Sequence, residues 1–144
     1  MKFSERAMQV TPSATVKVSN TAKAMIRQGI DVINLGIGEP DFKTPKVISD
    51  AAISAIQAGK TSFYTPASGL PQLKEAIANR IKQDYGVIYP ADQISVTSGA
   101  KMGLYVLMQA LVDEGTEVLL PKPSWVSYRQ QVLLAGGKPV VVET

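Results

Sequence analysis

The residue whose type and position first suggest chemistry is Lys101, which stands in the opening turn of an expected helix. Residues 94–101 read ISVTSGAK: a short β-forming run, a glycine turn and the start of a helical stretch. The opening turn of a helix has N–H groups without intrahelical acceptors, and a lysine there is unfavourable unless an anion shares the site. The pattern favours a phosphate or carboxylate site, although a Lys101 side chain that points into water is the simpler interpretation of this window alone.

Three further stretches combine turn-forming residues with groups that could touch a ligand. They are 36–42 (GIGEPDF), 63–66 (FYTP) with Gly69 after it, and 121–128 (PKPSWVSY). Each lies in a loop or at the carboxyl end of an expected strand, where α/β folds place ligands. Trp125 follows a strand and a Pro-x-Pro turn, so its indole is placed to stack on a flat ligand, although a lone tryptophan is more often a core residue.

The composition excludes several classes of chemistry. The chain of 144 residues has no histidine and no cysteine, which rules out imidazole bases, Ser-His-Asp triads, thiolate nucleophiles and disulfides from this sequence. The net charge of +3 comes without a basic run interleaved with aromatics, so nucleic acid is not an expected partner. Because the sequence has neither a signal-peptide core nor a membrane-length apolar run, we expect a soluble, cytoplasmic protein without a membrane partner.

The first half of the chain predicts helices more clearly than strands. A polar arm over 1–12 precedes a helix from Ser13 to about Gln28. A short strand is expected over 31–35, and a helix with Thr44 as its cap and Pro45 in its first position should run to about Ala58. We expect Ile48, Ala52, Ile53 and Ile56 of that helix to face inward, and another amphipathic helix over 70–85.

The second half alternates between strands and helices. After a turn or one-turn helix at 90–92, the expected elements are strands at 94–97, 117–120 and 138–142 and helices at 100–112 and 125–135. The alternation predicts a parallel, right-handed α/β sheet in which the strands at 117–120 and 138–142 pair in parallel. The helix over 100–112 is so uniformly apolar that we expect it to be covered on most sides, by the sheet or by another subunit.

The four stretches, in this order and spacing and with Ala135-Gly136-Gly137 before the last strand, resemble the N-terminal part of the class I aminotransferases. These are pyridoxal-phosphate enzymes of fold type I, and the likeness is closest to the bacterial aspartate aminotransferase subgroup. It covers residues 13–144. The resemblance implies a three-layer α/β/α large domain with a mostly parallel sheet. Residues 1–44 would be the arm, helix and substrate loop on the small-domain side, and 45–144 the incomplete first part of the large domain.

The resemblance also implies a cofactor-binding set. Gly99, Ala100 and Lys101 would bind the phosphate of pyridoxal 5'-phosphate through backbone amides, and Trp125 would stack on its ring. Tyr64 would reach across a homodimer interface to the phosphate in the partner subunit, so the two active sites would be shared. Without the family pattern, Tyr64 reads as an ordinary loop tyrosine.

A second set of implied roles concerns the substrate. Gly38 would offer its N–H to the α-carboxylate, Lys101 would face the distal carboxylate of an acidic substrate, and Trp125 would border the same site. Ser13 and Thr15 resemble the helix start that covers the site in a closed form. Taken alone, Gly38 also fits a plain turn, and Ser13 fits an ordinary helix cap equally well.

The catalytic residues of the family have no counterpart in this sequence. In the family, the Schiff-base lysine lies in a serine-rich block far downstream, as do the residues that hold the pyridine nitrogen and ring hydroxyl. None of the lysines here lies in a matching block. We therefore expect no catalytic residue in this chain and no transamination by it alone. The strand at 94–97 should also lack its native neighbours, because later strands separate it from the next two in fold type I.

The leading hypothesis is transfer of an amino group from aspartate, or a related acidic or aromatic amino acid, to a 2-oxo acid, as part of amino acid metabolism. A second hypothesis is another type I enzyme, such as a carbon–sulfur lyase or a cyclopropane-carboxylate synthase, but the block at 36–42 and Lys101 favour the aminotransferase. A third is the aminotransferase-like part of a cofactor-sensing regulator. The chain starts at Met1 with only a short arm, which argues against a preceding DNA-binding domain. A dinucleotide-binding domain is disfavoured because the turn at 97–101 lacks G-x-G-x-x-G.

Overall fold

A computed structural model describes residues 2–144 of the chain. These residues form two compact units, which are treated separately below. The first unit contains the chain up to Glu39 together with Gly99–Thr144, and the second unit is Pro40–Ser98. The predicted division at residue 44 into small-domain and large-domain segments concerns a larger assembly and stays a prediction.

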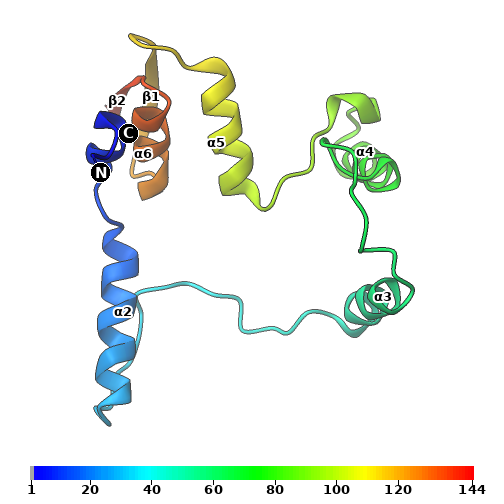
Figure 1. The fold of residues 1–144 in the computed structure, drawn as a ribbon, viewed down its shortest axis with the longest axis horizontal. Helices are drawn as coiled ribbons and strands as arrows, with labels where there is room; N and C mark the ends of the chain where they lie inside the picture. Colours follow the sequence, from blue (N-terminus) through cyan, green and yellow to red (C-terminus); the bar gives the residue numbers. More distant parts are fainter. Residues whose placement is uncertain (1) are drawn as a thin grey trace. The chain divides into compact units, whose positions relative to one another are not determined.

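The first unit is built on a two-stranded parallel sheet (Figure 1). Strand β1 (Glu117–Lys122) pairs with β2 (Lys138–Glu143), and helix α6 (Val126–Leu134) makes the crossover between them and contacts both. The parallel pairing predicted from the sequence is confirmed. Strand β1 is longer than expected, because Pro121 and Lys122 continue the ladder instead of leaving it as an irregular link.

Ion pairs hold the two ends of this ladder in register. Lys138 Nζ lies 2.6 Å from Glu117 Oε1 at one end, and Lys122 Nζ lies 3.0 Å from Glu143 Oε1 at the other. The hydrogen bond from Lys138 to Glu117, helped by the attraction of the carboxylate, raises the pKa of Lys138 above its ordinary value. Both ion pairs are exposed to solvent, so they help to fix the register of the two strands but add little stability.

A small core lies where α6 meets the sheet. Val132 of α6 is fully buried, and Val112 and Leu120 are nearly so. Gly137, which follows α6, is needed there because a Cβ at this position would overlap the Val112 side chain and stand 3.1 Å from the Thr116 carbonyl oxygen. The chain therefore enters β2 through a gap that admits only a glycine.

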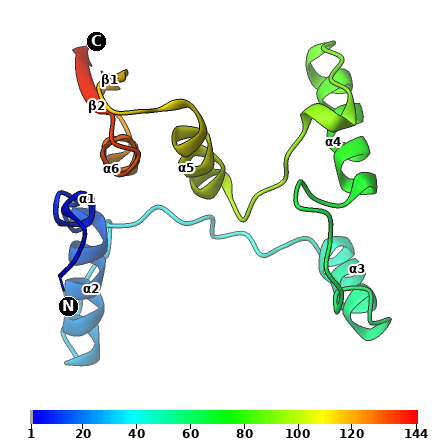
Figure 2. The ribbon, with the colours of Figure 1, turned by 45° about the horizontal axis from the view of Figure 1, so that its top comes forward.

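Three more helices belong to the first unit. Helix α1 (Glu5–Met8) contacts α6 (Figure 2), and so does α5 (Ala100–Leu111). Helix α2 (Ala14–Arg27) begins at Ser13, whose Oγ accepts a hydrogen bond from the Val16 N–H, as the sequence predicted.

The second unit consists of two α-helices and a short 3-10 helix. Helix α3 covers Lys46–Gln57, α4 covers Pro71–Tyr85, and η1 covers Ala91–Gln93 and contacts α4. Gly86 ends α4 in the left-handed conformation at φ 69°, as the predicted helix stop requires. Helix α3 starts one residue later than expected, with Pro45 as its cap and no capping hydrogen bond from the Thr44 side chain.

Two predicted strands are not strands in the structure. Residues 31–35 and 94–97 carry β-forming side chains, but neither segment lies in a ladder with another described segment. The Val96 N–H donates to the Ser68 carbonyl oxygen at 2.9 Å, which is a single contact and not a ladder. A strand exists only where a second backbone supplies its hydrogen bonds, so β-forming residues alone do not make one.

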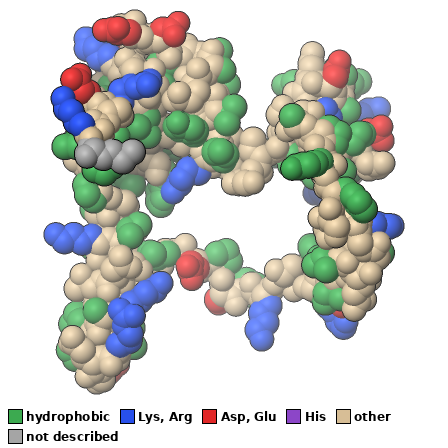
Figure 3. Space-filling view, viewed as in Figure 1, with side chains coloured by type: hydrophobic (Ala, Val, Ile, Leu, Met, Phe, Trp, Pro, Cys, Tyr) green, Lys and Arg blue, Asp and Glu red, His purple; other side chains and the backbone are tan. Residues whose placement is uncertain are grey.

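Two predictions of burial find no support within the described chain, and cover of the 100–112 helix by another subunit stays a prediction. Helices α3 and α5 have no buried residue. Ile48, Ala52, Ile53 and Ile56 of α3 are exposed, although they were expected to face inward. The apolar α5 is not covered on most sides. Figure 3 shows hydrophobic side chains on the surface of both units, so the periodicity correctly found apolar faces that nothing in the described chain covers.

Candidate functional site

The turn that leads into α5 places a glycine directly before the first residue of the helix. Gly99 is the N-cap of α5 at φ 85°, in the left-handed region that favours glycine. Its carbonyl oxygen accepts hydrogen bonds from the N–H groups of Met102 and Gly103, both at 3.2 Å, which closes the first turn. Ala100 and Lys101 are the first two residues of the helix, where the helix itself offers no acceptor for an N–H. The predicted glycine turn and helix start are therefore both present.

Lys101 and Trp125 come together, although they are far apart in the sequence. Lys101 Nζ lies 5.7 Å from the centre of the Trp125 ring, within the range of a cation–π contact. Lys101 lies in the first turn of α5 and Trp125 is the N-cap residue of α6, so the starts of the two helices meet. Half of the Trp125 surface remains exposed, which leaves the indole available for a further contact.

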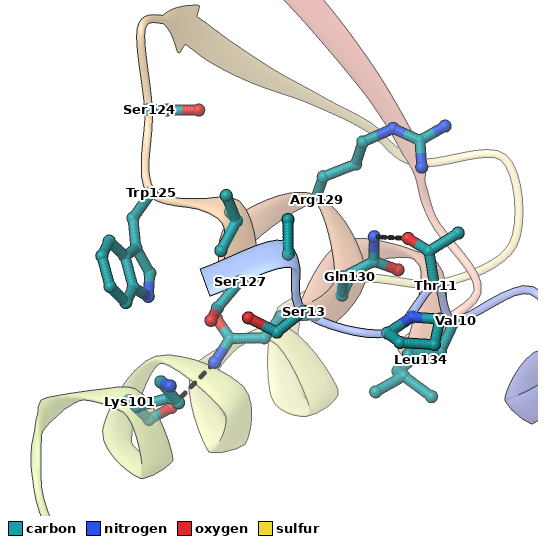
Figure 4. Close-up of a pocket in the computed structure, with 14 residues that line it drawn as sticks. Val10, Thr11, Ser13, Lys101, Ser124, Trp125, Ser127, Arg129, Gln130 and Leu134 are labelled. Carbon is teal, nitrogen blue, oxygen red and sulfur yellow. Dashed lines mark hydrogen bonds between the residues drawn. The ribbon is translucent and has the colours of Figure 1, made fainter. Parts of the chain in front are cut away.

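A cavity of about 640 Å³ opens beside this pair (Figure 4). Its walls come from the arm before α2, from Lys101 and from α6 with the two residues before it. The charged residues that line it, Lys101 and Arg129, are both cationic. A cavity with this lining attracts anionic ligands, and Trp125 at its edge offers a flat apolar surface.

Two adjacent glutamines of α6 tie the walls of the cavity together. Gln130 Nε2 donates to Thr11 Oγ1 at 2.8 Å, and Gln131 Nε2 donates to the main-chain oxygen of Lys101 at 2.9 Å (Figure 4). The Oε1 atoms of both glutamines are buried without a hydrogen-bond partner. Sequence reasoning missed these residues. The available signal was spacing, because Gln131 follows Ser127 by four residues and shares its helix face.

Ser13 is both a cap and a wall of the site. It caps α2 and also lines the cavity, so its two sequence interpretations are compatible. Thr15 is half-buried and is not among the residues that line this cavity.

Gly38 of the first unit is not among the residues that line this cavity. Gly38 is exposed, and no atom lies within 4 Å of where its Cβ would be, so it has the open surroundings that an approaching ligand needs. Tyr64 belongs to the second unit, where its side chain is fully exposed. An exposed tyrosine in a loop is compatible with a contact to another chain.

Comparison with known proteins identifies the family. The family model for aminotransferase class I and II matches residues 30–144. The chain belongs to this family. The match includes the glycine turn, Lys101 and Trp125, so these residues lie in a recognised aminotransferase sequence.

Curated aminotransferases share about half of their aligned residues with this chain. The aspartate aminotransferase of Geobacillus stearothermophilus is 52% identical over 143 residues, which are 99% of this chain and 36% of that protein. The aspartate aminotransferase of Bacillus subtilis is 50% identical over 143 residues, with the same coverage. The chain thus spans little more than a third of the length of these relatives.

Solved structures agree with the sequence comparison. The aspartate aminotransferase from Thermus thermophilus with maleate superposes with a TM-score of 0.96 at 42% identity, covering 100% of this chain and 37% of that one. The alanine aminotransferase from Pyrococcus furiosus superposes with a TM-score of 0.91 at 37% identity, covering 99% and 37%. The predicted fold, an N-terminal portion of a fold type I aminotransferase, is confirmed.

Membrane-spanning helices and metal-binding groups are two further features that bear on function. None of the described helices is long and apolar enough to cross a membrane. Over residues 2–144, no group of three or more Asp and Glu side chains could hold a metal ion.

Proposed function

We propose that this chain supplies the phosphate-binding turn, the ring platform and part of the substrate site of a pyridoxal-phosphate-dependent aminotransferase. The reaction is transfer of an amino group between aspartate, or a related acidic or aromatic amino acid, and a 2-oxo acid. The observation that carries the proposal is the approach of Lys101 to Trp125 beside a cavity with a cationic lining. This arrangement occurs in a chain of the aminotransferase family that is 52% identical to an aspartate aminotransferase.

The residues of the turn fit the cofactor. The amides of Ala100 and Lys101, which follow the turn at Gly99, would bind the phosphate at the positive end of α5, and the half-exposed Trp125 would carry the pyridine ring. Gly99 adopts a left-handed conformation, which a side chain at this position would strain. When bound, pyridoxal phosphate supplies an electron sink for the carbanion that transamination requires.

The substrate contacts are distributed over the first unit. Gly38 would donate its N–H to the α-carboxylate, and the Lys101 ammonium would meet the distal carboxylate of an acidic donor. Trp125 would close one side of the site against water. Maleate, the ligand named with the Thermus structure, is itself a dicarboxylate, which supports an acidic substrate.

The assembly we propose is a homodimer with shared active sites. Tyr64 is fully exposed, and it would reach the cofactor phosphate of a second copy. Residues 1–44 would join the small domain and residues 45–144 the large domain. The Schiff-base lysine would come from a part of the enzyme that this chain does not contain, and we expect no transamination by this chain alone.

A phosphate-dependent binding measurement tests the proposal. Pyridoxine 5'-phosphate, which lacks the aldehyde and so cannot react with surface lysines, is titrated into the chain. Trp125 is the sole tryptophan, so its fluorescence reports binding at this site. Pyridoxine without phosphate is the matched ligand. We expect the phosphate ester to bind about tenfold more tightly, as charge-assisted hydrogen bonds require. Equal affinities would contradict the proposal, and so would unchanged phosphate binding in Lys101→Ala with Gly99→Val.

A further inference from the structure

Gln131 is a buried polar residue that no role proposed so far uses. Only 6% of its surface is exposed, on a helix that packs against the sheet. Its Nε2 donates to the main-chain oxygen of Lys101 at 2.9 Å, and so joins α6 to the first turn of α5 (Figure 4). The bond spans 30 residues of sequence, and it ends on the residue whose ammonium lies over the Trp125 ring.

Neither helix needs this hydrogen bond. The carbonyl of Lys101 lies in the first turn of α5, where it accepts the ordinary helical bond from the residue four positions later. The Oε1 atom of Gln131 is buried and has no partner. A buried amide with an unpaired oxygen is less favourable than an apolar side chain of the same length. Packing alone would therefore favour methionine or leucine at this position, and the polar side chain needs another explanation.

The position of Gln131 offers that explanation. Gln131, Lys101 and Trp125 line both the 640 Å³ cavity and a second hollow of about 230 Å³. Trp125 is the N-cap residue of α6, and Gln131 lies further along the same helix. A bond from Gln131 to the Lys101 backbone therefore fixes the helix that carries the cation relative to the helix that carries the ring.

We propose that Gln131 is a positioning residue, which holds the first turn of α5 so that the Lys101 ammonium stands over the Trp125 ring. It acts through the Lys101 main chain and touches neither reacting group. Its effect on phosphate binding rests on the proposed function, whereas its effect on the geometry of Lys101 and Trp125 does not.

Ion-selective quenching of Trp125 measures that geometry without any ligand. Iodide is drawn to an indole beside an ammonium and caesium is repelled, so the ratio of the two quenching constants reports the position of Lys101. Lys101→Met sets the ratio for a ring without its cation. In Gln131→Met we expect the ratio to move at least halfway to that value, while the thermal midpoint stays the same or rises. An unchanged ratio of quenching constants overturns the proposal, whether or not the thermal midpoint falls.

A matched substitution and a second variant guard the interpretation. Gln109→Met makes the same change on the exposed surface of α5, outside the site, and should leave the ratio unchanged. Gln131→Glu keeps the length but cannot donate when ionised, and its ratio should return toward wild type as the pH is lowered and the carboxyl regains a proton. If both variants at 131 lose their helical circular dichroism, Gln131 is a structural residue and the proposal fails.

Phosphate affinity separates this proposal from the proposed function. Pyridoxine 5'-phosphate should bind Gln131→Met about fivefold more weakly than the wild-type chain, as expected for the loss of one ordinary hydrogen bond. If the wild-type chain shows no preference for the phosphate ester, the proposed function fails, and the quenching ratio still decides the role of Gln131. If the ester binds the wild type and Gln131→Met equally well while the quenching ratio is unchanged, only the proposed role of Gln131 is rejected.

Discussion

The two units contain similar apolar side chains but differ in what covers them. In the first unit, α6 packs against two paired strands and buries Val132 completely. In the second unit, α3 has a clear apolar face, yet Ile56 on that face is 62% exposed and no residue of α3 is buried. Helical periodicity therefore identifies which face of a helix seeks a partner, but only a second element within reach buries it. The aminotransferases matched by this chain are nearly three times its length, and their further sequence offers such partners.

The largest expected effect comes from the glycine that admits the chain into β2. Gly137→Ala should lower the free energy of unfolding of the first unit by about 3 kcal/mol, because the new methyl overlaps the Val112 side chain and crowds the Thr116 carbonyl. Urea unfolding followed by Trp125 fluorescence measures it, since Trp125 belongs to this unit. A variant as stable as the wild type would show that the first unit has no tightly packed core.

A single kind of substitution, made in both units, tests the comparison directly. Val132→Ala removes two methyl groups from a fully buried site and should cost about 2 kcal/mol. Val47→Ala makes the same change on an exposed helix face and should change stability by less than about 0.5 kcal/mol. Urea unfolding followed by far-ultraviolet circular dichroism covers both units. Equal losses of stability in the two variants would mean that Val47 of α3 is covered in solution, as a second copy of the chain would cover it.

Helix caps are expected to have a smaller effect, again with one case in each unit. Ser13→Ala removes the oxygen that accepts the Val16 N–H and should destabilise α2 by about 1 kcal/mol. Helix α3 has Pro45 as its cap and no capping side chain, so Thr44→Ala should cost almost nothing. Helical circular dichroism between 5 and 40 °C measures both. A loss in Thr44→Ala as large as that in Ser13→Ala would restore the predicted role of Thr44.

Local patterns in the sequence predicted most helices to within one or two residues, because caps, glycine stops and apolar spacing act over a few residues. The termination of α4 at Gly86 is an example. Residues 31–35 and 94–97 do not form strands, since a strand depends on a partner elsewhere in the chain, and only for 94–97 was the lack of neighbours predicted. Of the site, the turn at Gly99 was predicted from the local residue pattern, and the family likeness placed Lys101 and Trp125 around the same ligand. Gln131 was not predicted, because its contact with Lys101 spans 30 residues, and its four-residue spacing from Ser127 marks only a shared helix face.

The smallest expected effect is electrostatic and lies at the end of the sheet. The pKa of Lys138 is raised in the folded chain by its hydrogen bond and attraction to Glu117, so folding favours the protonated lysine. The resulting stabilisation is complete below the unfolded pKa of 10.5 and is lost as the pH rises through the higher folded value. The wild-type thermal midpoint should therefore fall more steeply above pH 10.5 than that of Lys138→Met, which has no proton to lose. Parallel curves for the wild type and Lys138→Met would mean that the cross-strand pair does not form in solution.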